Sequence, residues 1–452
     1  MIADHIERLY HGRLAEQVER LAYHAQRGEQ WDRAHGYWRQ AGAKAQARSA
    51  YREAADCFEQ ALQTLGHLPE SHDTIERAID TRFDIRNPLH VLGELGKLLD
   101  HLHEAETLAR GLGDQRRLGR ALSYLSQYSW LTGDNAKAIE AGRQALDLAG
   151  VVRDPMLEAT TNLYLGLAYD ALGEFRQATE VLQRTVDSLG EGRAGEPPGH
   201  APLVIHSTSW LALGLAELGE FPLAYGHAER AARIAETTDR SFDIVTAYFG
   251  IGYPALLQGD FPRAIRMFER GLALVEAGGF RTWEGTFTAS LGHAYSLSGR
   301  LGEALPPLER AASLKAGHYR FRWGYLAEAY SKLGRADEAR ALAERFLTRA
   351  HESKSRSQEA WALRLLGELA ATAPTPDPDR AEEHYRRALA LAEELGMRPL
   401  TARIHLGVGR LWRESAKRPE ATQALTQAAA LLREMDMRPW LEEALAELRA
   451  LG

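Results

Sequence analysis

The chain repeats one short pattern along most of its length: a small residue, in most copies a bulky residue four positions later, and a second small residue seven positions after the first. Ala264, Phe268 and Gly271 form one copy. Residues spaced by four and seven share one face of an α-helix. The pattern therefore predicts a recurring helix that buries a narrow face. The other copies begin at Ala54, Ala138, Ala178, Ala224, Ala304, Ala339, Ala381 and Ala421.

A second signal lies about a dozen residues before each copy, where a glycine or alanine follows an apolar residue, as at Gly252 and Gly292. Glycine inside a helix costs about 1 kcal/mol relative to alanine, so its recurrence indicates a close approach between two helices. The two signals are separated by a turn such as Gly259 to Pro262. Glycine suits a left-handed helix end, and proline suits the first turn of the next helix. Each repeat is therefore predicted to be an antiparallel helix hairpin.

The repeat is longer than the usual tetratricopeptide repeat. Ala224, Ala264 and Ala304 are spaced by 40 residues, whereas the tetratricopeptide (TPR) period is about 34. Six more residues shared by two helices lengthen each helix by about 4.5 Å. We expect an all-α fold: a right-handed TPR-like α-solenoid of antiparallel helix hairpins with a C-terminal capping helix.

The pattern also predicts how the repeats are distributed. The three-residue pattern, which we call the anchor, is weakest between Thr74 and Gly113. There we expect two helices broken near Asn87–Pro88. Glycine- and proline-rich segments indicate exposed loops. The expected parts are N-terminal TPR-like repeats at 1–113 with a degenerate hairpin at 74–113, repeats at 114–190, 203–371 and 380–437, loops at 191–202 and 372–379, and a capping helix at 438–452.

Charge and composition exclude several classes of partner. The net charge of −7 argues against nucleic acid or an anionic membrane as the main partner. No apolar run approaches the roughly 18 residues of a membrane span, and residues 1–10 lack the apolar core of a signal peptide. We therefore expect a cytoplasmic protein. Cys57 is the single cysteine, and its apolar neighbours predict a buried position, with a reactive thiol as the alternative.

The sequence also lacks the common catalytic motifs. The nearest match to a phosphate-binding loop, Gly93 to Lys97, has the wrong spacing. His101 and His103 are two residues apart and do not share a helix face, and no zinc-protease or nucleophile-elbow motif is present. We therefore expect no enzyme activity, no catalytic or metal-binding residues and no cofactor.

Distinctive sequence occurs in segments 14–25, 40–45, 58–62, 92–96, 128–134, 395–399 and 435–440. These segments resemble the C-terminal region of a known bacterial architecture. It joins a class III nucleotide cyclase domain, an AAA or STAND-type ATPase and a C-terminal TPR tail; the elongated repeats are like those of maltose-type transcriptional activators. The resemblance implies a regulatory role for an attached or associated ATPase or cyclase, in the tail of a longer protein or a free-standing relative.

A solenoid presents a binding surface formed by the first helix of each hairpin. We predict a non-catalytic scaffold that binds a protein or peptide there; the alternative is a sensor of a small molecule or peptide. No particular oligomeric state is predicted. Trp38, Trp323 and Trp361 are expected in the core, while Trp130 and Trp412 are left open. The candidate groove residues, for which a solvated polar face is the alternative, are Arg120, Gln127, Tyr164, Thr246, Tyr253, His293, Arg403 and Arg410.

Overall fold

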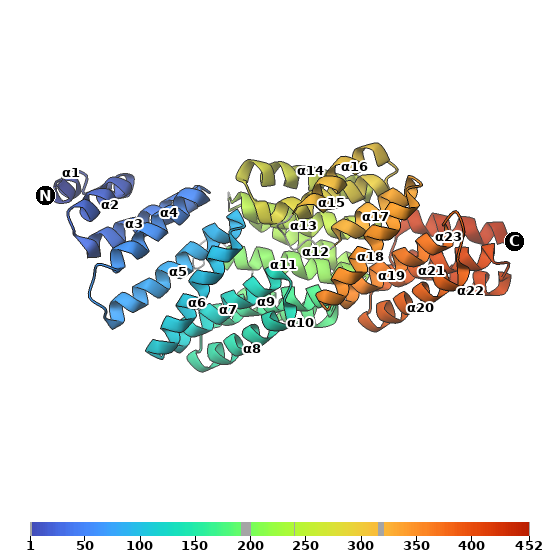
Figure 1. The fold of residues 1–452 in the computed structure, drawn as a ribbon, viewed down its shortest axis with the longest axis horizontal. Helices are drawn as coiled ribbons and strands as arrows, with labels where there is room; N and C mark the ends of the chain where they lie inside the picture. The colour runs from blue at the N-terminus through green and yellow to red at the C-terminus, as the bar shows by residue number, and fades with distance from the viewer. Residues whose placement is uncertain (1, 191–199, 239, 315–320, 452) are drawn as a thin grey trace. The chain divides into compact units, whose positions relative to one another are not determined.

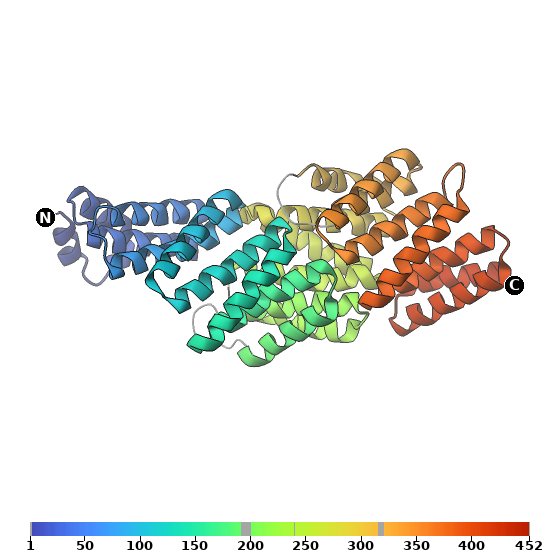
Figure 2. The same ribbon diagram turned by 60° about the horizontal axis from the view of Figure 1, so that its bottom comes forward.

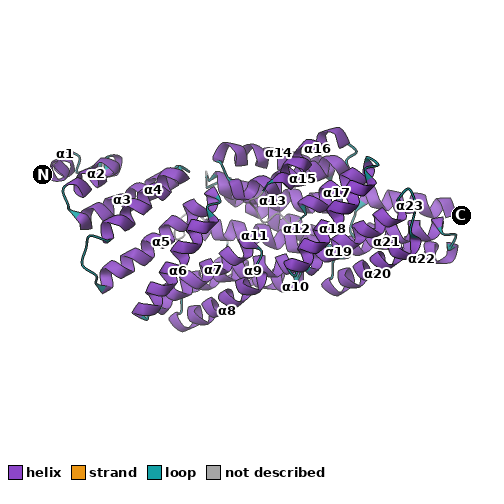
Figure 3. Ribbon diagram, in the orientation of Figure 1, coloured by secondary structure: helices purple, strands orange, loops and turns teal. Residues whose placement is uncertain are grey.

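The computed structural model describes residues 2–190, 200–238, 240–314 and 321–451. This part of the chain contains α-helices and one short 3₁₀ helix, and no strand (Figure 3). The chain divides into two compact units. Unit 1 comprises Met1–Tyr128, Glu140–Thr161 and Gly278–Thr282, and unit 2 comprises Ser129–Ile139, Asn162–Ala277 and Trp283–Gly452.

Unit 1 is built from the first helices of the chain. Helices α3 and α4, and likewise α5 and α6, pack against each other as hairpins (Figure 1). Their buried apolar side chains form a core around Phe58, Ile85 and Leu102. The helices are α1 (Ile2–Leu9), α2 (Val18–Arg27), α3 (Trp31–Ala47), α4 (Tyr51–Leu65), α5 (His72–Leu92), α6 (Leu95–Leu112), α7 (Gln115–Thr132), α8 (Asn135–Val152) and α9 (Pro155–Leu172), of which the last three contribute residues to both units.

Unit 2 continues the hairpins, as Figure 2 shows for the pairs α19 with α20 and α21 with α22. We call the odd-numbered helices from α3 to α21 the A helices and their even-numbered partners the B helices. The helices are α10 (Phe175–Leu189), α11 (His200–Glu217), α12 (Phe221–Ala235), α13 (Ser241–Gln258), α14 (Phe261–Gly278), α15 (Arg281–Leu297), α16 (Leu301–Ser313), α17 (Arg322–Lys332), α18 (Ala336–Glu352), α19 (Arg356–Ala371), α20 (Pro378–Leu395), α21 (Arg398–Glu414), α22 (Arg418–Glu434) and α23 (Arg438–Leu451).

The repeated small residues are the points where the helices of a hairpin come closest. All nine anchor alanines are fully buried. A Cβ atom added to Gly252 would lie 2.6 Å from Cε1 of Phe268, and one added to Gly292 would lie 2.7 Å from Cγ of Leu308. Only glycine therefore fits at these two positions without displacing atoms of the B helix, chiefly the side chains of Phe268 and Leu308, which confirms the predicted hairpins.

The turns also follow the prediction. Gly259 ends α13 in the left-handed conformation, with a φ of 94°. The backbone N–H of its neighbour Asp260 donates a hydrogen bond to the carbonyl of Ala255 at 2.9 Å. This bond satisfies a carbonyl at the end of the helix. Pro262 then occupies the second position of α14, where a missing N–H is tolerated.

Three predicted boundaries differ from the helix bounds in the structure. The break near Asn87–Pro88 does not occur: α5 continues through Pro88 to Leu92 and is capped by Gly93, with a φ of 71°. Proline removes one backbone hydrogen bond, but Ile85 and Leu89 on either side of Pro88 are buried in the core, and their packing holds the last turn of the helix.

The two predicted loops are shorter than expected. Residues 191–199 of the first lie outside the described residues, and α11 already begins at His200. In the second, the Asp377 carboxylate accepts the N–H of Arg380 at 3.0 Å. This cap starts α20 at Pro378, so that loop ends at residue 377.

Within unit 2, late hairpins pack on the ends of early ones. The Ser355 hydroxyl donates to the carbonyl of Ala171 at 2.7 Å, and the Gln258 amide donates to the carbonyl of Met435 at 3.0 Å. These contacts join segments about 180 residues apart, since the sequence separations are 184 and 177. As a result the A helices of unit 2 are covered on both sides, and α13 is buried from Phe242 to Leu257 except for Ile244.

Candidate ligand-binding cavities

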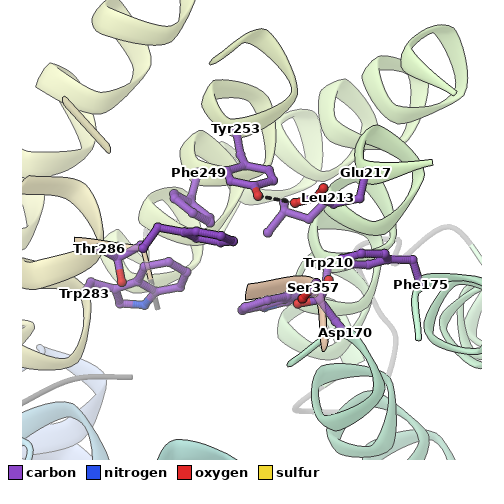
Figure 4. Close-up of a pocket in the computed structure, with 11 residues that line it drawn as sticks. Asp170, Phe175, Trp210, Leu213, Glu217, Phe249, Tyr253, Trp283, Thr286 and Ser357 are labelled. Carbon is purple, nitrogen blue, oxygen red and sulfur yellow. Dashed lines mark hydrogen bonds between the residues drawn. The ribbon is translucent and has the colours of Figure 1, made fainter. Parts of the chain in front are cut away.

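Unit 2 contains a cavity whose wall is mostly aromatic, which we call the aromatic cavity. It opens to solvent, and the space inside it and at its mouth together amounts to about 500 Å³. Its lining comes from the A helices α9, α11, α13, α15 and α19, from the first residue of α10 and from the residue before α17 (Figure 4). The lining residues are Asp170, Phe175, Trp210, Leu213, Glu217, Phe249, Tyr253, Trp283, Thr286, Phe321 and Ser357.

Helical spacing brings these side chains to one place. Trp210, Leu213 and Glu217 stand three and seven residues apart on α11, and Phe249 and Tyr253 stand four apart on α13. Both spacings keep side chains on one helix face. Each A helix therefore presents a short stripe to the cavity while its opposite face packs on its own B helix.

Ring-to-ring contacts hold the aromatic wall in place. The ring centroid of Phe249 lies 5.5 Å from that of Trp283 and 5.7 Å from that of Tyr253. Trp210 packs edge-on against Trp130, with centroids 5.5 Å apart. These distances lie in the range of favourable aromatic pairs. The wall is consequently rigid and presents flat apolar surfaces.

Polar groups are placed among the rings. Asp170 and Glu217 are each only 3% exposed, and the Tyr253 hydroxyl donates a hydrogen bond to Glu217 (Figure 4). The buried Thr286 hydroxyl has no hydrogen-bond partner. The described lining residues include carboxylates but no lysine, arginine or histidine. The cavity can therefore hold an apolar group and accept hydrogen bonds from N–H or O–H donors on it.

A second, smaller cavity lies elsewhere in unit 2, and we call it the Arg403 cavity; the space inside it and at its open mouth together amounts to about 300 Å³. It is formed by α13, α15, α17, α19, α21 and the start of α23. It shares no lining residue with the aromatic cavity. The lining residues are Leu256, Leu257, His293, Leu297, Tyr325, Trp361, Pro399, Arg403, Met437 and Trp440.

A buried ion cluster lies beside this second cavity. Glu328 binds two arginines: its Oε2 lies 3.1 Å from Nη2 of Arg364, and its Oε1 lies 3.2 Å from Nη2 of Arg403. Burial would raise the pKa of Glu328, but Arg403 and Arg364 together hold it far below its usual value. Arg364 also pairs with Glu368 at 2.7 Å. Glu328 is therefore ionised and is shared between two cations.

His293 is held in its neutral form at the wall of the same cavity. Its ring stacks on Tyr325 with centroids 3.7 Å apart and planes 3° from parallel. Burial lowers the pKa of His293 to about 3, and the nearby carboxylate of Glu328 opposes this effect. At neutral pH the imidazole thus contributes polar atoms to the cavity but no charge.

The structure brings three of the eight predicted groove residues to the cavities. Tyr253 lines the aromatic cavity, while His293 and Arg403 line the Arg403 cavity. Thr246 and Tyr164 are also buried, but they line neither cavity. The sequence alternative of a solvated polar face does not hold for these five, because other helices of unit 2 cover the A helices.

The other three predicted residues are partly buried and have partners. Arg410 on α21 pairs with Glu443 at 2.7 Å and with Glu447 at 2.9 Å. In unit 1, the Cζ atom of Arg120 lies 4.7 Å from the ring centroid of Phe83. Gln127, also in unit 1, accepts a hydrogen bond from Arg86. Neither Arg120 nor Gln127 lines either of the two cavities.

Sequence reasoning missed most of the aromatic cavity, including Trp210, Phe249 and Trp283. A signal for it is present in the A helices. Helix α13 has one charged residue, Asp243, in 18 positions, and a helix that is apolar on all sides is buried on all sides. Such a helix has no solvated groove face, and its large aromatic residues then become the candidate ligand contacts.

Other sequence expectations concern single side chains. Trp323, Trp361 and Trp130 are buried, whereas Trp38 is half-buried. Cys57 is buried, and burial raises the pKa of its thiol to about 11. Over the residues that the structure describes, no cluster of histidine, cysteine, aspartate or glutamate is arranged to hold a metal ion. None of the described helices combines the length and the hydropathy needed to cross a membrane.

Solved structures with a similar backbone establish the fold class. One is the crystal structure of a Rap protein complexed with competence and sporulation factor; the TM-score is 0.50 at 13% identity, over 89% of this chain and 99% of that one. Another is the Rap conjugation gene regulator of the plasmid pLS20 in complex with the Phr* peptide; the TM-score is 0.51 at 13% identity, over 80% of this chain and 97% of that one. The chain has a TPR-like α-solenoid fold. No protein-family model matches the sequence, and no curated protein matches it.

Proposed function

We propose that the chain is a non-catalytic regulatory protein that binds a peptide, or a peptide-like segment of a protein, in the aromatic cavity. The observation that carries the proposal is the convergence of aromatic side chains from successive hairpins on one cavity. Aromatic side chains dominate binding hot spots because they offer large contact areas and lose few rotamers. Six of them around one space form a site for an apolar side chain.

The polar groups of the cavity fit a peptide ligand. Carboxylates such as Asp170 and Glu217 have several lone pairs, so each can accept a ligand N–H in addition to its present contacts. Thr286 adds a hydroxyl that both donates and accepts. The two similar solved structures were determined as complexes, one with competence and sporulation factor and one with a peptide. We extend that kind of ligand to this chain.

The relay of binding would use the contacts between early and late hairpins of unit 2. The Ser355–Ala171 and Gln258–Met435 hydrogen bonds join segments on either side of the cavity-lining helices. A ligand that packs between α11, α13 and α19 would stabilise these contacts, because it binds only the folded arrangement. In the architecture that the sequence resembles, the receiver of this signal is an attached or associated ATPase or cyclase.

A second candidate is a sensor of a small molecule. The aromatic cavity has deeply buried walls, and such concave apolar sites with few polar groups are typical of small-molecule sites. A peptide would extend out of the opening, whereas a small molecule would be enclosed. The two candidates are therefore distinguished by the ligand that is selected.

The test is a selection from a random peptide library, followed by calorimetric titration of the selected peptides. Leu213→Trp fills the aromatic cavity, because Leu213 lines it and is 5% exposed. Leu223→Trp makes the same change at a leucine on α12 that is 56% exposed and serves as the matched control. We expect peptides with an aromatic or branched aliphatic residue that bind the control variant and not Leu213→Trp.

Two results would contradict the proposal. Peptides that bind Leu213→Trp as tightly as the wild-type chain would place the peptide site elsewhere. Failure to select any peptide, together with stabilisation of the wild-type chain but not of Leu213→Trp by a small apolar molecule, would favour the second candidate. At a ligand concentration 100 times the Kd, stabilisation amounts to about 2.7 kcal/mol.

A further inference from the structure

The Arg403 cavity has the chemistry of a separate ligand site. Most of its wall is apolar, with Leu256, Leu297 and Met437 on different segments. The only charged residue among its described lining residues is Arg403. An apolar cavity with a single cation in its wall favours a ligand that has an apolar body and one negative charge.

Arg403 shares its carboxylate partner with another arginine. Its nearest carboxylate, Glu328, is also bound by Arg364. Burial and the neighbouring Arg364 lower the pKa of Arg403. Burial acts in the same direction on Arg364, but Glu328 and Glu368 outweigh it and raise the pKa of Arg364. An arginine keeps its proton in proteins. An anion in the cavity would therefore give Arg403 an acceptor that it does not share with a second arginine.

Aromatic rings orient the guanidinium. The Cζ atom of Arg403 lies 5.0 Å from the ring centroid of Trp361 and 5.2 Å from that of Trp440. Both indoles line the cavity. This placement fixes the side chain without occupying all of its N–H groups with protein acceptors, since an arginine has five of them.

Two buried polar atoms in the wall have no hydrogen-bond partner. They are Nε1 of Trp361, in a residue that is 7% exposed, and Nδ1 of His293, in a residue that is 2% exposed. A buried polar group without a partner costs about 1–3 kcal/mol. Both residues line the Arg403 cavity, so a ligand there is one source of the missing partners.

We propose that the Arg403 cavity binds a small organic acid with an aromatic or branched aliphatic body. Its carboxylate accepts hydrogen bonds from Arg403 and from Nε1 of Trp361. His293, which is neutral, supplies a further polar contact, and the body of the acid packs against Leu297 and Trp440. This inference does not depend on the peptide site, because the two cavities share no lining residue.

The lining also decides between ligand classes. A phosphate group carries more charge and is usually held by several basic residues or by backbone N–H groups at a helix start. The described lining of this cavity offers one arginine. A cationic ligand is disfavoured because the wall presents Arg403 and no carboxylate. A monocarboxylate matches the single charge and the donors that are present.

The experiment is a calorimetric titration of the full chain with phenylacetate and indole-3-acetate, and with phenylacetamide as the uncharged analogue. A peptide with a C-terminal phenylalanine is compared as the free acid and as the amide. We expect at least one acid to bind, and its uncharged analogue to bind about tenfold or more weakly, because hydrogen bonds to charged groups are lost. Binding by the small acids or by the free-acid peptide identifies the source of the carboxylate, and either supports the site.

Two variants locate the binding. Leu297→Trp fills the cavity at a half-buried residue, and Leu333→Trp, at a leucine that is 41% exposed, is the matched control. We expect Leu297→Trp to lose acid binding and Leu333→Trp to keep it. Arg403→Gln removes the cation while Glu328 keeps Arg364, and it should weaken acid binding about tenfold or more without changing the affinity of phenylacetamide.

Three results would overturn the inference. One is equal affinity for the acids and their amides. Another is full acid binding by Leu297→Trp. The third is the absence of measurable binding by every acid tested. A loss of peptide binding by Leu213→Trp with intact acid binding would leave the two sites independent, so failure of one proposal is distinguishable from failure of the other.

Discussion

The close approach of helices at Gly292 gives a prediction whose size follows from the structure. A Cβ atom there would lie 2.7 Å from Cγ of Leu308 and 3.0 Å from the carbonyl oxygen of Ala304. Relief of both contacts requires the Leu308 side chain to move and the backbone of α16 to shift by a few tenths of an ångström. Such overpacking typically costs about 1–3 kcal/mol. The same substitution gains about 1 kcal/mol because alanine is a better helix former than glycine.

Gly226 provides the matched control. It lies in the middle of α12, and a Cβ atom there would meet nothing within 4 Å. Gly226→Ala therefore gains helix propensity without a packing cost and should stabilise the chain by about 1 kcal/mol. Because the propensity gain is common to both variants, the difference between Gly226→Ala and Gly292→Ala isolates the packing cost, which should be about 1–3 kcal/mol.

The assay is urea unfolding followed by far-UV circular dichroism, with the midpoints of both variants compared with that of the wild-type chain. We expect the midpoint to rise in Gly226→Ala and to lie well below that of Gly226→Ala in Gly292→Ala. Gly292→Leu should lower it further. Equal midpoints for the two alanine variants would refute the close approach of α15 and α16 at Gly292 and with it the hairpin arrangement.

Three further predictions concern buried groups. Glu328→Gln removes the carboxylate shared by two buried arginines and should lower the free energy of unfolding by about 3–5 kcal/mol, measured by urea titration; a loss below about 1 kcal/mol would contradict the cluster. The pKa of His293 is about 3 in the folded chain and about 6.5 when unfolded, so the unfolded chain binds more protons between these values, and stability should fall as the pH drops from 6.5 towards 3. His293 contributes at most about 1.4 kcal/mol of this loss of stability per pH unit. Urea titrations of His293→Asn at several pH values should lack this contribution. A pH dependence equal to that of the wild-type chain would show that His293 is not buried in neutral form. Cys57, whose pKa is raised to about 11 by burial, should react with a thiol reagent at pH 8 only after urea unfolding; rapid reaction of the folded chain would contradict its buried position.

Local sequence patterns predicted the hairpins because each hairpin depends on nearby residues. The anchor alanines, the close-approach glycines and the left-handed turn glycines all act within one repeat, and the structure places them as predicted. The error at Pro88 has a different origin. A proline usually ends a helix, but here the buried neighbours Ile85 and Leu89 compensate for one missing hydrogen bond.

The cavities depend on contacts that no local pattern encodes. The Ser355–Ala171 and Gln258–Met435 hydrogen bonds join hairpins that are not neighbours in sequence, whereas repeat periodicity describes only the packing of adjacent repeats. The sequence interpretation therefore treated Thr246 as a groove residue, although it is 1% exposed. In the sequence, only the low charge of A helices such as α13 indicated that both of their faces are covered.

The central claim is that the aromatic cavity of unit 2 is the peptide-binding site, and its most direct test is ¹⁹F NMR of the chain labelled with 5-fluorotryptophan. Trp210 and Trp283 line the cavity, whereas Trp412 on α21 lines neither cavity. On addition of a selected peptide, the signals of Trp210 and Trp283 should shift and that of Trp412 should stay in place. A peptide that shifts Trp412 and leaves Trp210 and Trp283 unchanged would contradict the account.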